Sequence, residues 1–427
     1  MKIFLVFFII GQILMAAKID SIEINGVQIP LIYEEESRLP IVTTQIVFTN
    51  SGTITDVKKA GLAKFSAKIL NEGTKTEGSN AFAEDLESKA IHISASSGTE
   101  TFVLEVSSLT EQYINSLKYL EKLLKDPNYS KNSMTKIQTM TLGSLSRKEN
   151  DFDYIAGNEL KKVMFAGTVL AEPSSGTIES VKSITLNDVK SFLKEHLVLS
   201  RAIVVVGGDI SIDEVKKSMS KVLKNLPLGE NSTVTHYDVR KDAKTSIIEK
   251  ETEQAYVYFG SPYNMKVDDA EYYKARVATF ILGTGGFGSR LMEEIRVKRG
   301  LAYSAYARVH VSKSSSYMSG YLQTKLESMD EAKATVSEVI ENFVKNGVTK
   351  EELEQTKKFL LGSEPLRVET MSQRLNRTFM EYYKGFELGH SVTELEKIKK
   401  LKLKDLNRYI KSHREILDIS FAIVTKK

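Results

Sequence analysis

The strongest constraint on the fold of this chain is an internal repeat. The helical pattern of residues 186–196 returns at residues 403–413, with leucine, aspartate, an aromatic ring, lysine and histidine at matching positions. Each copy carries the apolar period of an amphipathic helix with an aspartate in its first turn, and a strand-like apolar segment follows each, at 201–206 and 419–424. The repeat predicts a tandem duplication of one α+β domain.

The segments upstream of the two copies follow one coarse order. In each half, strands lead to a helix, two further strands follow, and a run of helices comes last. The polar stretch 227–244 is rich in Pro, Gly, Asn and Ser, which is typical of a linker. We therefore expect an N-terminal domain at 18–226 and a C-terminal domain at 245–427. The expected strands are 19–24, 41–49, 91–96 and 101–107, then 255–260, 303–311 and 317–324, with helices near 56–70, 270–282 and from 329 onward.

The first 17 residues have the pattern of a secretory signal peptide. Met1-Lys2 precedes an apolar run at 3–15, which is short for a bilayer span, and Ala16-Ala17 follow it. An uncleaved anchor or a first strand are the alternatives, because Met15 is large for a cleavage site. No other long apolar run occurs, so no integral membrane segment is expected after signal removal. The chain also has no cysteine, and an exported protein without disulfides fits a bacterial periplasm best.

Charge and composition exclude some classes of function. Apolar residues make up 41% of the chain and charged residues 27%, which indicates a folded globular protein. The net charge of +4 is spread along the chain, and no arginine-rich block alternates with aromatic residues. Nucleic acid is therefore not an expected partner.

Residues 282–303 combine a glycine turn, a short helix with a basic end, and the start of a strand. This segment resembles the second-domain signature of the pitrilysin (inverzincin, insulinase-like) zinc peptidases. Gln254, residues 347–357 and Gly61-Leu-Ala support the same register. The resemblance covers essentially the whole mature chain, and it implies an α+β fold of two homologous domains, each an antiparallel sheet packed with helices.

The glycines at 283, 285, 286 and 288 could also suggest a phosphate-binding loop. They follow an expected helix rather than a strand, and no Gly-Lys-Ser/Thr ending is present. Formation of a turn explains them better than nucleotide binding.

The metal site of the family is missing from this sequence. Catalytic zinc needs about three protein ligands, usually including two histidines one helical turn apart, and no two of the six histidines lie within four positions of each other. At the family's motif positions stand Lys64 and Lys68 in place of the histidines and Ala67 in place of the glutamate base. The stretch 140–146, where the resemblance places the last ligand, has no acid. We expect neither zinc nor another cofactor in this chain. Lys64 and Lys68 either form a solvated helix face or fill the emptied pocket with charge.

Arg296 and Tyr303 match a pair that family members use in catalysis. The resemblance implies that they bind the substrate backbone and the oxyanion of the transition state, opposite a zinc ion on another domain. The alternative is structural, with Arg296 in a cationic surface cluster beside Lys298 and Arg299 and with Tyr303 packed on the core.

Three functions remain open. The first is a subunit that is inactive alone and supplies Arg296 and Tyr303 to a zinc-bearing partner subunit with His-x-x-Glu-His, for hydrolysis of peptide substrates. The second is a catalytically inactive scaffold or assembly protein on the same fold. The third, an autonomous peptidase with another site, has no residues to support it. The retained pair favours the first.

Overall fold

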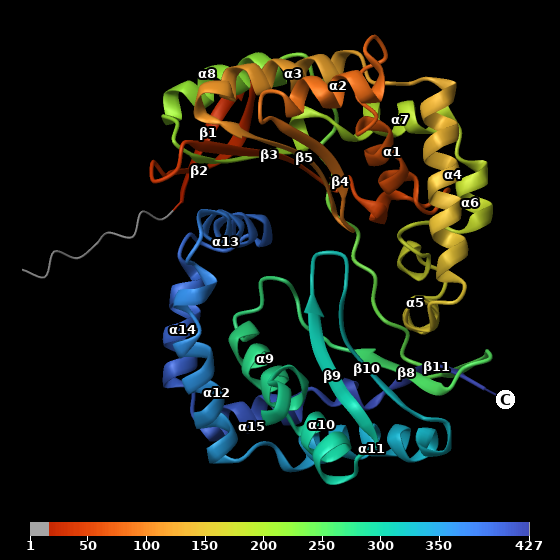
Figure 1. Cartoon of the computed structure of the whole chain (residues 1–427). Helices are drawn as coiled ribbons and strands as arrows, with labels where there is room; N and C mark the ends of the chain where they lie inside the picture. Colours follow the sequence, from red (N-terminus) through yellow and green to blue (C-terminus); the bar gives the residue numbers. More distant parts are fainter. Residues whose placement is uncertain (1–16, 427) are drawn as a thin grey trace, which may run out of the picture.

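The computed structural model describes residues 17–426 and shows two helix-covered sheets (Figure 1). The expected signal peptide at 1–17 lies, apart from its last residue, outside the described residues. Within the described part, no helix has the length and apolar character needed to cross a bilayer.

The first sheet has six strands in the order β1-β2-β6-β3-β5-β4. Strand β5 buries every second residue, so one of its faces is covered. Strand β6 buries all of its residues, so both of its faces are covered. The strands are β1 (Lys18–Ile24), β2 (Val27–Glu35), β3 (Ile41–Thr49), β4 (His92–Ser97), β5 (Thr101–Leu109) and β6 (Ala202–Gly208).

The second sheet repeats this order as β7-β11-β8-β10-β9, so that β2, β6, β3, β5 and β4 correspond to β7, β11, β8, β10 and β9. The strand directions match as well, which supports the duplication. The expectation of purely antiparallel sheets is wrong in one respect, because β2 runs parallel to β6 and β7 runs parallel to β11. A strand inserted between two antiparallel strands must run parallel to one of them. The strands are β7 (Thr245–Glu249), β8 (Gln254–Pro262), β9 (Ala302–Val311), β10 (Ser316–Lys325) and β11 (Ser420–Thr425).

Helices cover both sheets and bury a separate apolar core in each half. Those of the first half are α1 (Leu62–Leu70), α2 (Gly78–Glu87), α3 (Tyr113–Lys125), α4 (Lys131–Lys148), α5 (Phe152–Met164), α6 (Ile178–Ser183), α7 (Leu186–His196) and α8 (Ile212–Leu223). Those of the second half are α9 (Tyr272–Thr279), α10 (Arg290–Met292), α11 (Met329–Asn346), α12 (Lys350–Gly362), α13 (Met371–Lys384), α14 (His390–Lys400) and α15 (Leu403–Ser412).

The two halves exchange equivalent helices. Helix α5 leaves the first half and packs on β8 and β11 of the second sheet, while α13 leaves the second half and packs on β2 and β6 of the first (Figure 1). Leu160 and Met164 thereby join an apolar cluster with Ala422, and Leu375 joins one with Ile32. Each sheet therefore has one face completed by the other half of the chain.

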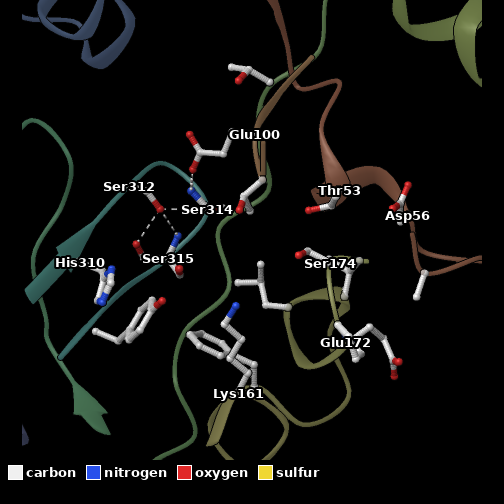
Figure 2. A pocket seen from close by; sticks show the side chains of 18 of the residues that line it. Thr53, Asp56, Glu100, Lys161, Glu172, Ser174, His310, Ser312, Ser314 and Ser315 are labelled. Atoms are coloured by element: carbon white, nitrogen blue, oxygen red, sulfur yellow. Dashed lines mark hydrogen bonds between the residues drawn. The ribbon is translucent and has the colours of Figure 1, made fainter. Parts of the chain in front are cut away.

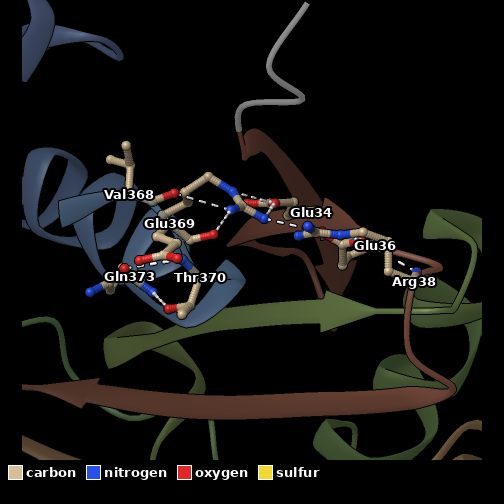
Figure 3. Close-up of polar contacts among 8 residues, drawn as sticks. Glu34, Glu36, Arg38, Val368, Glu369, Thr370 and Gln373 are labelled. Carbon is tan, nitrogen blue, oxygen red and sulfur yellow. Dashed lines mark hydrogen bonds and ion pairs between the residues drawn. The ribbon is translucent and has the colours of Figure 1, made fainter. Parts of the chain in front are cut away.

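Polar contacts at the start of α13 reinforce this exchange (Figure 3). The Arg374 guanidinium donates from Nε to Oε1 of Glu34 at 2.7 Å and lies 3.3 Å from Oε2 of Glu36. Further donors of Arg374 reach the backbone oxygens of Val368 and Glu369. The Glu34 carboxylate is almost completely buried, so this ion pair is a desolvated contact between the halves.

Candidate functional site

Helix α1, which carries the degenerate metal positions, begins at a glycine with left-handed backbone. Gly61 has a φ of 90°, and a Cβ there would lie 2.8 Å from the backbone of Ser175 and Gly176. The buried Asp56 carboxylate accepts the backbone N–H groups of Gly61 and Ala63, although burial raises its pKa to about 7. Only glycine allows the loop with Ser175 to approach so closely, and this approach places its neighbour Ser174 beside α1.

Lys64 and Lys68 each reach a hydroxyl group on a neighbouring segment. Lys64 Nζ donates to Ser174 Oγ at 2.8 Å, and Lys68 Nζ donates to Thr141 Oγ1 on α4 at 2.9 Å. Burial lowers the pKa of both ammonium groups, and repulsion from Lys148 lowers each further. The Lys68 side chain is exposed and that of Lys64 is half-buried, and each ammonium group is held by a hydroxyl group of another segment.

These residues do not fit a zinc ion. Two ammonium groups carry no lone pair and repel a divalent cation, and the Ala67 methyl group cannot accept a proton from water. The hydrogen bond from Lys68 places Thr141 at the facing position on α4, and a hydroxyl is a weak substitute for a carboxylate ligand. Within residues 17–426, no three His, Cys, Asp or Glu side chains lie close enough together to hold a metal ion.

Arg296 and Tyr303 lie together on the surface of the second half. The Arg296 guanidinium carbon lies 4.2 Å from the centre of the Tyr303 ring and 4.6 Å from that of Phe287, so aromatic rings hold the guanidinium in place. The Tyr303 side chain is 82% exposed, and its expected alternative as a core residue is therefore wrong. Tyr303 lies where the pairing of β9 with β10 is irregular, because Ala302 pairs with Thr324 whereas Ala305 pairs with Leu322. This irregularity interrupts the alternation of buried residues and leaves the ring exposed.

The cationic neighbours of Arg296 are engaged elsewhere. Lys298 pairs with Glu294 at 2.7 Å, and Arg299 pairs with Glu338 at 2.8 Å. In the described part of the chain, Arg296 forms no ion pair with a carboxylate. Its hydrogen-bond donors are thus left available at the surface, unlike those of the two neighbouring cations.

The glycine turn positions this pair. A Cβ at Gly283 would lie 2.5 Å from the backbone oxygen of Ala307, so the turn packs directly on β9. Gly286 has a φ of 62°, and the turn then leads to Arg290, which forms a two-pronged ion pair with Glu352 at the start of α12. The glycines therefore form a turn. The turn is fixed at Gly283 by its contact with β9 and at Arg290 by the ion pair with Glu352.

A cavity of about 420 Å³ lies between the two halves (Figure 2). The segment before α1 lines one side with Asp56, and the loop carrying Ser174 lines another together with Lys161 from α5. The far wall comes from His310 and the serines of the β9–β10 turn. The degenerate metal positions Lys64, Ala67 and Lys68 are not among the described residues that line it, and neither is the pair Arg296 and Tyr303.

The sequence did not single out Phe287, Lys161 or Glu100 as site residues. Phe287 lies inside the recognised glycine turn and its exposure at 65% has no sequence signal. Lys161 and Glu100 approach the cavity only because α5 and the β4–β5 turn cross to the second half. Contacts created by such an exchange cannot be found from local sequence patterns.

Comparison with known proteins identifies the family. The model described as insulinase (peptidase family M16) matches residues 33–177, and the model described as peptidase M16 inactive domain matches residues 183–360. A Helicobacter pylori protein described as the non-peptidase homolog YmxG is 42% identical, over 100% of this chain and 99% of its own length. The chain belongs to peptidase family M16. It is a homologue of a protein described as a non-peptidase, and its residues at positions 64, 67 and 68 do not fit a zinc ion.

Solved structures agree with this assignment of the fold. A peptidase M16 inactive domain from Pseudomonas fluorescens has a TM-score of 0.88 at 21% identity, covering 96% of this chain and 98% of its own. The periplasmic protease PqqL from Escherichia coli has a TM-score of 0.78 at 13% identity. Here the match covers 96% of this chain but 47% of the larger protein. This two-domain M16 unit therefore has the fold of about half of that longer chain.

Proposed function

We propose that this chain is the non-zinc subunit of a heteromeric zinc metallopeptidase. The observation that carries the proposal is the state of Arg296 and Tyr303, which present unused donors at the surface of a chain that has lysine and alanine at the family's metal positions on α1. This exposed arrangement of the two side chains has no structural role within the chain itself. Opposite a zinc-bound carbonyl group, the Tyr303 hydroxyl and the Arg296 guanidinium would supply hydrogen bonds to a developing oxyanion.

The proposed partner is a second two-domain chain that carries His-x-x-Glu-His and binds zinc. Coverage of about half of the PqqL chain supports this arrangement, because a longer protein can hold in one chain two units that here would be separate. The substrate would be a peptide enclosed between the two chains. An inactive scaffold protein on the same fold is the competing function, and it would leave Arg296 and Tyr303 without a role.

The location that fits this proposal is the periplasm, on the basis of the residues at 1–17. Cell fractionation should find a mature protein that begins near Lys18. Recovery of the full-length chain from the cytoplasm would contradict this location.

Mixing the two chains tests the proposal. The purified chain alone should bind no stoichiometric zinc and cleave no peptide, and the zinc-bearing chain alone should be weakly active or inactive. Together they should form a stable complex that cleaves peptides and loses this activity on chelation of zinc. A stable complex with no peptidase activity on a broad peptide library would favour the scaffold function.

A further inference from the structure

Four lysines from three helices gather around the degenerate metal positions. Lys64 and Lys68 lie one turn apart on α1, Lys148 ends α4, and Lys161 lies on α5. Lys148 Nζ lies 4.3 Å from the centre of the Tyr154 ring. No carboxylate within residues 17–426 forms an ion pair with any of the four lysines, although many other lysines of the chain have such a partner.

The other three lysines of the cluster repel the Lys64 ammonium group. Burial contributes most to lowering the pKa of Lys64, and Lys148, Lys161 and Lys68 lower it further. The charge of Asp56 raises the pKa of Lys64, but the Asp56 carboxylate already accepts backbone N–H groups at the start of α1. The cluster is therefore a concentration of positive charge in which Asp56 is a counter-charge to Lys64 without forming an ion pair with it.

The cluster borders the cavity between the halves, and of its four lysines Lys161 lines that cavity. Ser174, which accepts the hydrogen bond of Lys64, lines that cavity together with Lys161 (Figure 2). Phe165 and Leu170 add an apolar wall next to Lys161. Apolar walls with a few fixed charged groups are typical of sites that bind a small part of a larger ligand.

We propose that the lysine cluster around Lys64 and Lys68 binds carboxylate groups of a peptide, either acidic side chains or a free C terminus. Lysine ammonium groups form charge-assisted hydrogen bonds with carboxylates, and the hydroxyls of Ser174 and Thr141 hold two of these ammonium groups in position. The site would thus bind an anion where the family's zinc subunits bind a cation. The choice of a peptide as the ligand rests on the proposed function.

Peptide binding by the purified chain tests this proposal. Fluorescence anisotropy would compare three labelled peptides: a glutamate-rich peptide with blocked ends, its glutamine counterpart with blocked ends, and the glutamine peptide with a free C-terminal carboxylate. We expect one or both carboxylate peptides to bind more tightly than the blocked glutamine peptide, and added salt to weaken this binding. Preference for the first identifies acidic side chains, and preference for the last identifies the C terminus.

Paired substitutions locate the site. The double variant Lys64→Gln with Lys68→Gln should weaken binding of the preferred peptide about tenfold or more, because two charge-assisted contacts are lost. Replacing both by arginine should retain binding. The matched control is Lys217→Gln with Lys221→Gln, at the same spacing on the exposed side of α8, and it should change affinity less than about twofold. Melting temperatures would verify that all variants fold, and Lys161→Gln offers a second probe of the cluster.

Two results would overturn the proposal: equal binding of all three peptides, or unchanged binding by both the Lys64/Lys68 glutamine variant and Lys161→Gln. Neither result depends on a partner, since only this chain is present. Carboxylate binding without activity after mixing would remove the proposed peptidase function but keep this site.

Discussion

At the scale of single residues, the exposed ring of Tyr303 carries the most information. An aromatic side chain on a sheet strand normally buries much of its surface, yet this ring covers only the face of Arg296 and leaves its hydroxyl in solvent. The adjacent Phe287 ring is also exposed and lies over the same guanidinium. The guanidinium of Arg296 is therefore held by two aromatic rings that are themselves exposed.

We expect Tyr303→Phe to lower the turnover of the mixed complex about 10- to 1000-fold, the range for loss of one oxyanion donor. The ring remains, so its contact with Arg296 and the assembly of the complex should both persist. Tyr306→Phe is the matched control, because this tyrosine lies on the same strand but its ring is half-buried beside Tyr321. Steady-state kinetics with size-exclusion chromatography measure both effects. Normal turnover in an assembled Tyr303→Phe complex would remove the catalytic role of the hydroxyl.

Only some of the residues of the candidate site could be predicted from the sequence. Lys64, Ala67 and Lys68 could be located because a motif fixes their spacing on one helix. The proximity of Arg296 and Tyr303 also follows from a short helix and a strand joined by a tight turn. The hydroxyl partners Ser174 and Thr141 could not be predicted, since they are far from α1 in the chain and reach it only through tertiary packing.

At the scale of elements, the sequence did not reveal two strands: β7, which is an edge strand, and β2, which lies next to an edge. The short edge strand β7 alternates between exposed and half-buried residues and has no buried apolar face. In β2, Pro30 interrupts an otherwise apolar run, and proline weakens a prediction of a strand. The central strands were expected because their burial requires long apolar or alternating patterns.

Helix α13 presents a different limitation. Its amphipathic pattern predicts a helix but does not show which sheet it covers. The structure places it on the opposite half, where Arg374 pairs with the buried Glu34. Burial raises the pKa of Glu34 even though Arg374 acts in the opposite direction, so the carboxylate depends on its partner to remain charged.

We expect Arg374→Ala to lower the free energy of unfolding by roughly 3–5 kcal/mol, because Glu34 is left as an unpaired buried charge. Adding Glu34→Gln to this variant should restore part of the loss, since the remaining group is then neutral. The control is Arg377→Ala on the same helix, whose partner Glu364 belongs to the same half, and it should cost about 1 kcal/mol. Urea denaturation would measure all three. If Arg374→Ala costs no more than the control, the ion pair between Arg374 and Glu34 contributes little to the free energy of unfolding.

At the scale of the whole molecule, equivalent parts of the two halves meet each other. The β4–β5 turn and the β9–β10 turn are corresponding hairpin ends, and Glu100 of the first accepts the backbone N–H of Ser314 in the second at 2.6 Å. Its other oxygen accepts the Tyr383 hydroxyl at 2.7 Å. Tyr383 belongs to the exchanged helix α13, which packs on the first sheet, while α5 packs on the second. The duplication therefore produces an arrangement with approximate twofold character, which no local pattern in the sequence could specify.

This contact sets the orientation of the halves around the cavity that Glu100 and Ser314 line. Burial and the neighbouring Glu100 both raise the pKa of Tyr383, which keeps its hydroxyl protonated and able to donate. Glu100→Ala removes both acceptors and leaves the buried N–H of Ser314 without its partner, at a cost of about 1–3 kcal/mol. Since the exchanged helices remain, the halves should stay attached but separate more readily at the hairpin ends.

We therefore expect Glu100→Ala to give a larger radius of gyration in small-angle X-ray scattering and faster proteolysis of residues 227–244, without loss of secondary structure. The control is Glu105→Ala, because Glu105 lies on β5 of the same hairpin but accepts its hydrogen bond from Gln45 in the first half. That variant should scatter like the unaltered chain. If a zinc-bearing partner binds the closed arrangement, Glu100→Ala should also weaken assembly, since part of the binding free energy must then close the halves. Identical scattering by both variants would mean that helix exchange alone fixes the orientation.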